Sequence, residues 1–255
     1  MIMKNLTQYI TEKLVLKSNT NIRNSNQYNY HPKTKEELKA LVKQLIEERG
    51  NEADLNDIDT FEIKDMSGLF QFSEFNGDIS NWDVRNVKDM YWMFYESKFT
   101  GENSDLSNWD VSNVQDMWGM FNGSPFNGDI SKWDVSNVEK MHNMFMKSKF
   151  NGDISKWNVS KVKSMFSMFL QTNFNGDISN WDVSNVTDMN WMFYGSAFNR
   201  DISKWDVSSV ENMGHMFEFS KFNQDISKWK INKKCAVYDM FKDCPIKEEY
   251  KPHNK

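Results

Sequence analysis

The sequence contains few cysteines, prolines and glycines: two, four and eleven, respectively, among 255 residues. Cys235 and Cys244 are too few for a disulfide scaffold, and neither has metal-ligand companions near it in sequence. Such low proline and glycine contents exclude a collagen-like or low-complexity chain. No run reaches the about 18 apolar residues of a membrane helix, so we expect no transmembrane segment.

The repeat region has fewer basic than acidic residues. Residues 51–255 contain 22 Lys and Arg against 31 Asp and Glu, and the whole chain has a net charge of -5. Binding to DNA or RNA draws most of its affinity from cationic side chains placed on phosphates. The acidic composition therefore predicts no nucleic-acid partner.

Motifs that carry catalysis or bind cofactors are also missing. The sequence has no Gly-rich phosphate loop and no CxxC or HExxH motif. Its four histidines share no neighbourhood with Ser, Cys or a carboxylate at a recognisable catalytic spacing. We therefore expect no enzymatic activity, no cofactor and no metal. The four histidines of the sequence are His31, His142, His215 and His253.

What the chain has in excess is aromatic residues and methionine, and they recur with a fixed period. Ten Trp, 19 Phe and 17 Met are present, and one pattern repeats six times at a spacing of 24 residues and once at 27. A period of this length is typical of stacked repeats, in which no copy is stable alone. The marker residues of the eight copies are Ile58, in a degenerate first copy, and Trp82, Trp109, Trp133, Trp157, Trp181, Trp205 and Trp229.

Each copy contains two segments with different patterns. Val186, Met189 and Met192 recur at steps of three, which predicts a helix of two to three turns, with Asn185 as its N-cap. The segment NGDISNW is short and rich in turn residues, which indicates a brief strand that pairs with the neighbouring copies. The predicted fold is an α/β solenoid of about eight 24-residue coils, each with a short parallel strand and a short helix.

The segments around the repeat differ in composition. Thr34 and Glu37 form a capping box before an apolar stripe, and Gly50 ends it, which predicts a helix that caps the first coil. The predicted divisions are a short amphipathic leader at 1–16, a flexible linker at 17–32, the capping helix at 33–50, the repeats at 51–246 and a charged tail at 247–255.

An aspartate precedes the marker by four residues in every copy. The NGD context resembles calcium-binding rolls, but those are built from nonapeptides. Stacked carboxylates at about 5 Å repel by about 1 kcal/mol per pair, and backbone N–H groups in Asx turns can supply the donors that they need. We expect a structural column: Asp54, Asp78, Asp105, Asp129, Asp153, Asp177, Asp201 and Asp225.

The copies differ most at the positions ten and thirteen residues after the marker, on the outer side of the predicted helix. Two aromatic pairs there should be exposed four coils apart, about 19 Å, and Trp and Tyr commonly anchor interfaces. The alternative is that these rings fold back over neighbouring helices. The candidate binding residues are Trp92, Tyr95, Trp118, Phe166, Trp191 and Tyr194.

The recurring strings NVTDMNWMF, WDVSNV and FNGDIS, over roughly residues 51–246, resemble the BspA-type leucine-rich-repeat family, in the variant of mycoplasma surface lipoproteins. The resemblance implies a right-handed leucine-rich-repeat solenoid, no catalysis, and adhesion to host proteins at the cell surface. Residues 1–17 lack the continuous apolar core of a secretory signal, so the sequence itself predicts a cytoplasmic or particle-associated protein.

Three functions stay open at this stage. The leading hypothesis is a non-enzymatic repeat protein that binds another protein, of unknown identity, through exposed residues of its helical edge. The first alternative is a structural spacer or assembly subunit that docks through its N-terminal peptide. The second is a glycan-binding module, since exposed aromatic rings also suit sugars. The chain would act as a monomer or as a subunit of an assembly.

Overall fold

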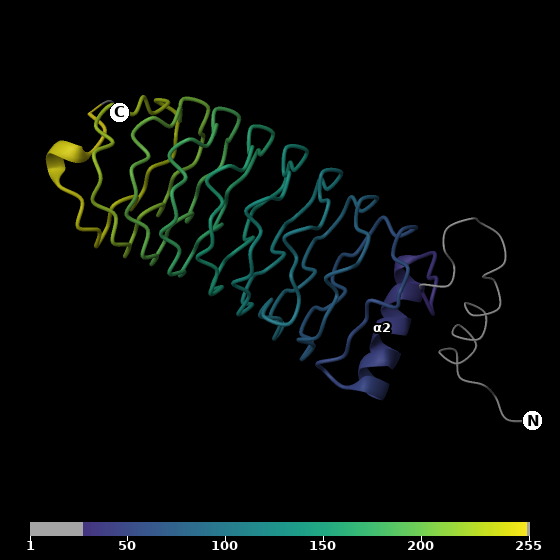
Figure 1. The fold of residues 1–255 in the computed structure, drawn as a ribbon. Coiled ribbons are helices and arrows are strands. Elements are labelled where there is room, and N and C mark those ends of the chain that lie inside the picture. The colour runs from purple at the N-terminus through teal and green to yellow at the C-terminus, as the bar shows by residue number, and fades with distance from the viewer. Residues whose placement is uncertain (1–27, 254–255) are drawn as a thin grey trace, which may run out of the picture.

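The computed structural model describes residues 28–253, so the predicted leader and residues 17–27 of the predicted linker lie outside the described residues. The described chain forms an elongated stack of coils that runs from a helix at the N-terminal end to a short helical turn at the C-terminal end (Figure 1). We number the coils 1 to 8 by their markers, from Ile58 to Trp229. Parallel β-bridges join each coil to the next, from the pair Asp65 and Asp89 to the pair Asn212 and Ala236.

The interior of the stack consists of the repeated apolar positions. In coil 6, Val186, Met189 and Phe193 are fully buried, and Trp181 is 3% exposed. The Trp181 indole N–H donates to the carbonyl oxygen of Ile154 in the preceding coil (3.1 Å). Phenylalanine rings stack from coil to coil at 5.4–5.9 Å between centroids. Each coil therefore completes the core of its neighbours, as a stacked repeat requires.

The prediction of a short helix in each coil is wrong. The helices of residues 28–253 are α2 (Lys35–Arg49) and the 3-10 helix η1 (Glu248–Tyr250), and both flank the coils. In the segment predicted to be helical, alternate N–H groups donate to the next coil, so they are not available for bonds within a helix. In coil 6 these bonds run from Met189 to Asn212 (2.9 Å), from Trp191 to Gly214 (3.0 Å) and from Phe193 to Met216 (2.9 Å).

Turns with left-handed residues shape this segment instead. The Met192 N–H donates to the Met189 carbonyl (3.2 Å), and Trp191 between them has a φ of 60°. A left-handed third residue is the requirement of a type II turn. The next left-handed residue follows four positions later, at Gly195 (φ 61°). These turns also direct residues three apart to the core, so the apolar spacing did not distinguish them from a helix.

The predicted strand is also absent from the described coils, where the bridges are isolated. The NGDISNW segment contains one bridge, between Asp54 and Asp78, while the column of bridges runs through the turn segment. In this segment, side-chain amides also join neighbouring coils. For example, Asn175 Oδ1 accepts the backbone N–H of Asn199 in the next coil (2.9 Å). Asn185 caps no helix and donates to the Ser160 carbonyl one coil back (2.9 Å). The right-handed leucine-rich-repeat assignment stays a prediction.

The helix α2 lies against the first coil and covers its open side (Figure 1). Its N-cap is Thr34, whose Oγ1 accepts the N–H of Glu37 (3.2 Å), and its C-cap is Gly50, with a left-handed φ of 89°. Its apolar stripe joins the core of the stack. The buried residues of this stripe are Leu38, Leu41, Val42 and Leu45. Neither helix of residues 28–253 has the length and apolar content to cross a bilayer.

The flanking residues at both ends pack on the coils more than the sequence suggested. The Asn29 N–H donates to Asp57 O (2.8 Å), and Tyr30 forms a parallel bridge with Ile58. The predicted flexible linker is therefore wrong for residues 28–32, because Tyr30 packs against the core. At the other end, the Ile226 N–H donates to the Tyr250 carbonyl (3.0 Å), so the predicted charged tail folds back through η1.

The left-handed positions predict a stabilising substitution. They stand ten and fourteen residues after each marker, and glycine occupies four of them: Gly68, Gly119, Gly123 and Gly195. Lys147 is exposed with a φ of 54°. Lys147→Gly should remove about 1–2 kcal/mol of backbone strain from the folded state. Part of this gain is offset, because glycine loses more conformational freedom on folding than lysine does. We expect the free energy of unfolding to rise by about 0.5–1 kcal/mol, measured in urea.

The matched control is Lys149→Gly, two residues further on, where the residue is exposed and φ is not left-handed. This change should lower the free energy of unfolding, because glycine only adds chain entropy there. Equal effects of the two substitutions would contradict the assignment of strain to the left-handed positions.

Candidate binding face

The outward residues of the turn segments form one side of the stack, which we call the turn face. In each coil it comprises those residues seven to fourteen positions after the marker that do not point into the core; in coil 6 they lie within 188–195. The same position of successive coils lies in one column, because each turn segment donates to the next. Side chains 24 residues apart in sequence are therefore neighbours on this face. The turn face also carries the largest variation between copies, which a recognition surface needs.

Six rings gather at the N-terminal half of the turn face. Trp92 stacks on Tyr91 (4.4 Å between centroids) and on Tyr95 (4.9 Å), and Trp118 contacts it at 5.9 Å. Trp92, Tyr95 and Trp118 are all half-buried by these contacts. Phe72, at the edge of the group, is 66% exposed. The N-terminal aromatic cluster is Phe72, Tyr91, Trp92, Tyr95, Trp118 and His142.

A second group lies at the C-terminal half and is more open. Trp191 is 39% exposed and stacks on Tyr194 (5.6 Å), while Phe166 lies 6.5 Å away on the preceding coil. Phe219 and Tyr238 are 50% and 52% exposed. The C-terminal aromatic cluster is Phe166, Trp191, Tyr194, His215, Phe219 and Tyr238.

The predicted exposure of the two aromatic pairs is therefore wrong for three of the four rings. Trp92, Tyr95 and Tyr194 are half-buried against their neighbours, and Trp191 is exposed. The position thirteen residues after the marker is also buried in coils 3, 5 and 7, so it is not a uniformly outer position. Asn122 is 8% exposed, and Leu170 and Glu218 are both 4% exposed.

Three exposed rings were missed by the sequence analysis. Phe72 and Phe219 occupy the position fourteen residues after the marker, and Tyr238 occupies the position nine residues after it. Other coils have polar residues at the position of Phe72 and Phe219, for example Lys147 and Gln171. The available signal was an aromatic residue outside the repeated core register, which the helix assignment concealed.

The aspartate column occupies a different part of the coil, before the marker. Asp177 Oδ1 accepts the backbone N–H of Ser179 (2.9 Å), and the other seven aspartates make the same bond to the residue two positions on. The backbone N–H of Ser179, with its hydroxyl, lowers the pKa of Asp177. These carboxylates thus have local donors, as an Asx turn provides.

A second acidic column lies on the turn face beside the N-terminal aromatic cluster. Asp65, Asp89 and Asp116 are joined by successive bridges. Lys35 pairs with Asp65 (3.2 Å) and Lys140 with Asp116 (2.8 Å), so cations lie at both ends of the column. Partial burial, and then the carboxylates of Asp116 and Asp65, raise the pKa of Asp89. The middle carboxylate is therefore the one whose charge costs stability.

Comparison with known families supports the repeat organisation. A family model described as "Mycoplasma protein of unknown function, DUF285" matches residues 37–149, 98–196 and 148–251, which together cover most of the chain. The chain belongs to this family. In this DUF285 protein the three overlapping matches reflect tandem repeats. No curated protein and no solved structure gives a significant match. The BspA-type assignment stays a prediction.

The acidic column predicts a pH-dependent gain of stability. A pKa raised by folding means that ionisation of Asp89 costs stability at pH values above that pKa. Asp89→Asn removes the charge, and Asn212 shows that asparagine can accept the same backbone bond at this position (3.0 Å from the Gly214 N–H). We expect the free energy of unfolding at pH 7 to rise by roughly 1 kcal/mol or less, which a higher melting temperature would show.

This gain should shrink as the pH falls through the raised pKa, because the wild-type carboxyl is then neutral as well. The matched control is Asp188→Asn in the same column, whose bridge partners Ser164 and Asn212 are uncharged. The control should show no comparable gain in thermal melts at pH 7. A gain for Asp89→Asn that persists at pH 3 would refute the electrostatic explanation.

Proposed function

We propose that this DUF285 protein is a non-enzymatic binding protein that docks another protein on its turn face, centred on the C-terminal aromatic cluster. One observation carries the proposal. The large hydrophobic side chains that are exposed in residues 28–253 are Phe72, Trp191, Phe219 and Tyr238, and all four lie on the turn face. The repeated Trp and Phe residues of the core are buried.

The fold does not require aromatic residues at these places. The column of Trp191 contains Asn143 in coil 4, and the column of Phe219 contains Gln171 in coil 5. Exposing large rings to water without a structural need is the signature of an interaction site. Because the rings pack on one another at 4.9–5.6 Å, they would lose little conformational freedom on binding.

Charge defines the expected partner further. The acidic column of Asp65, Asp89 and Asp116 lies beside the N-terminal aromatic cluster, and residues 51–255 carry an excess of acidic residues. A partner with apolar side chains flanked by Lys and Arg would be complementary to this face. Such a partner would be steered to the turn face more strongly at low ionic strength.

The proposal predicts that a double variant loses its partner but keeps its fold. Trp191→Asn with Phe219→Gln replaces each ring by the residue that another coil has in the same column. Hot-spot aromatic residues commonly contribute 2 kcal/mol or more, so affinity should fall by at least about tenfold. The measurement is capture of partners from lysates by the immobilised protein, followed by surface plasmon resonance with the partner identified.

The control for this test is Lys228→Ala, which changes an exposed residue beside the buried marker Trp229 and outside the turn face. Circular dichroism and melting should match the wild type for both proteins. Retained affinity in the folded double variant would refute the proposed site. Binding that is found only on a glycan array would favour the sugar-binding alternative.

Deleting residues 1–27 separates this function from the structural alternative. The deletion should end at residue 27, because Asn29 and Tyr30 bond to the first coil. Under our proposal, the shortened protein binds its partner with unchanged affinity, since the turn face is intact. Loss of partner capture or of co-assembly in a folded deletion protein would instead support docking through the N-terminal peptide.

A further inference from the structure

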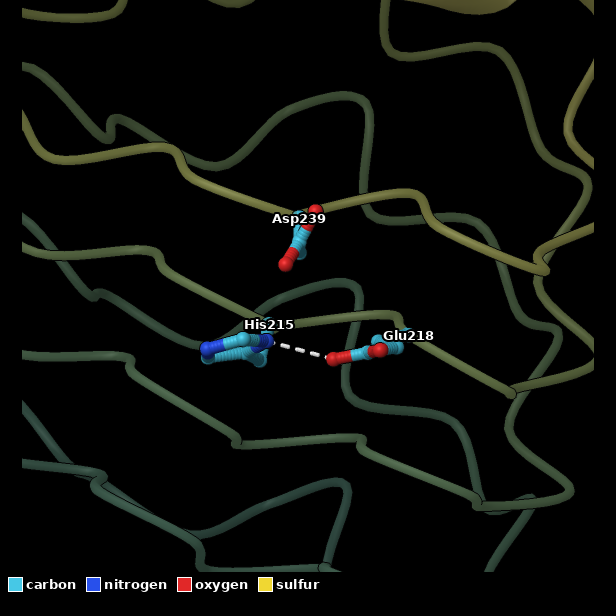
Figure 2. A group of neighbouring side chains, drawn as sticks. All are labelled: His215, Glu218 and Asp239. Atoms are coloured by element: carbon cyan, nitrogen blue, oxygen red, sulfur yellow. Dashed lines mark hydrogen bonds and ion pairs between the residues drawn. The ribbon is translucent and has the colours of Figure 1, made fainter.

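Three potential metal ligands from two coils meet on the turn face near its C-terminal end. His215 and Glu218 lie on coil 7, and Asp239 lies on coil 8, 24 residues after His215 (Figure 2). His215 Nδ1 is hydrogen-bonded to Glu218 Oε2, and the carboxylate of Asp239 extends from its own coil toward this pair. One ligand atom of each residue lies within 4.8 Å of the other two.

We propose that His215, Glu218 and Asp239 bind one divalent transition-metal ion, with zinc the best match. An imidazole nitrogen and two carboxylate oxygens are ligands that zinc accepts at about 2.0–2.2 Å, which places tetrahedral ligand atoms roughly 3.4 Å apart. Asp239 is exposed, so its side chain can turn to close the remaining distance. Calcium and magnesium fit less well, because both prefer a shell of oxygen ligands.

The site is largely preorganised by its neighbours. The His215 ring is held edge-on between Trp191 (5.5 Å) and Tyr238 (4.9 Å), which fixes its orientation. Glu218 is buried, with 5% of its side chain exposed. Its two carboxylate oxygens face His215 Nδ1 and the Lys242 ammonium, so the side chain is held beside the imidazole.

The local charge also favours a cation. Glu218 and Asp239 contribute two negative charges, against the single positive charge of Lys242, whose Nζ lies 3.2 Å from Glu218 Oε1. The ammonium competes with a metal for the same carboxylate. A metal ion would take the place of the proton that His215 Nδ1 shares with Glu218, and that proton moves to Nε2 of the ring.

The three residues are not needed for the turns themselves. The two columns that contain His215 and Glu218 hold Asn143 and Met146 in coil 4, and Trp191 and Tyr194 in coil 6. Three protein ligands leave a fourth position for water or for a side chain of a bound protein. The site shares His215 with the C-terminal aromatic cluster, but zinc binding does not depend on the function proposed above.

The test uses the full chain without a histidine tag and isothermal titration with zinc chloride. We expect one zinc ion per chain and a raised melting temperature in zinc. Cobalt(II) should give visible absorption bands whose intensity indicates four-coordination. His215→Ala should weaken zinc binding by more than about tenfold, since even the loss of a supporting residue costs about 10- to 100-fold.

Asp239→Ala should weaken binding similarly, and it decides the matter if His215→Ala does not fold, because Asp239 is exposed. Lys242→Met should tighten binding, since it removes the competing ammonium, whereas a purely structural ion pair would only lose stability. The control is His31→Ala, which removes another histidine that faces a carboxylate, Asp59 at 3.1 Å. Zinc binding that is absent from the wild type, or unchanged in His215→Ala and Asp239→Ala, overturns the proposal.

Discussion

In coils 1 to 7, alternate backbone N–H groups of the turn segment donate to carbonyl oxygens of the next coil, and the described fold depends on this series of bonds. In coil 6 the donors are Met189, Trp191 and Phe193, and their acceptors lie in coil 7. In a coil alone these polar groups would bond only to water and the core face would be exposed, so nothing would offset the entropy lost on ordering the chain. Stacking satisfies both demands together. The stack then needs closure at its ends, where the apolar stripe of α2 and Tyr250 of η1 pack against the core.

The same bonds require an unusual backbone. Two residues in each coil have left-handed φ, and in most coils at least one of them is not glycine. Such residues cost about 1–2 kcal/mol each, so their neighbours must stabilise them. The asparagine side chains help, since Asn175 Oδ1 and Asn185 Nδ2 bond to backbone groups of adjacent coils. The left-handed geometry also points side chains such as Trp191 and His215 away from the core.

Function is distributed in columns as a consequence. A residue on the turn face has its nearest partners 24 positions before and after it, and these columns bring Asp65 beside Asp89 and His215 beside Asp239. Exposed rings, an acidic column and three possible metal ligands therefore share one side of the molecule. Copies that agree in their core differ on this side, so recognition can change without disturbing the stack.

The sequence by itself determined the repeat period, the core positions and the capping helix. Met189 and Met192, whose regular spacing marked them as one repeated apolar pattern, are buried, and Thr34 and Gly50 bound a helix where the capping pattern predicted one. These features depend on residue type and spacing alone. The resemblance to a mycoplasma repeat family agreed with the DUF285 matches.

Only the tertiary structure decided which backbone conformation satisfies that spacing. A helix and a series of turns both direct Val186, Met189 and Met192 to one side, and bonds to a neighbouring coil selected the turns. Exposure followed from the same choice, which buried Glu218 and opened Phe219 to solvent. The grouping of His215, Glu218 and Asp239 also arises between coils. Contacts between coils join residues that are about 24 positions apart in sequence. The pattern of side chains within one copy therefore could not predict them.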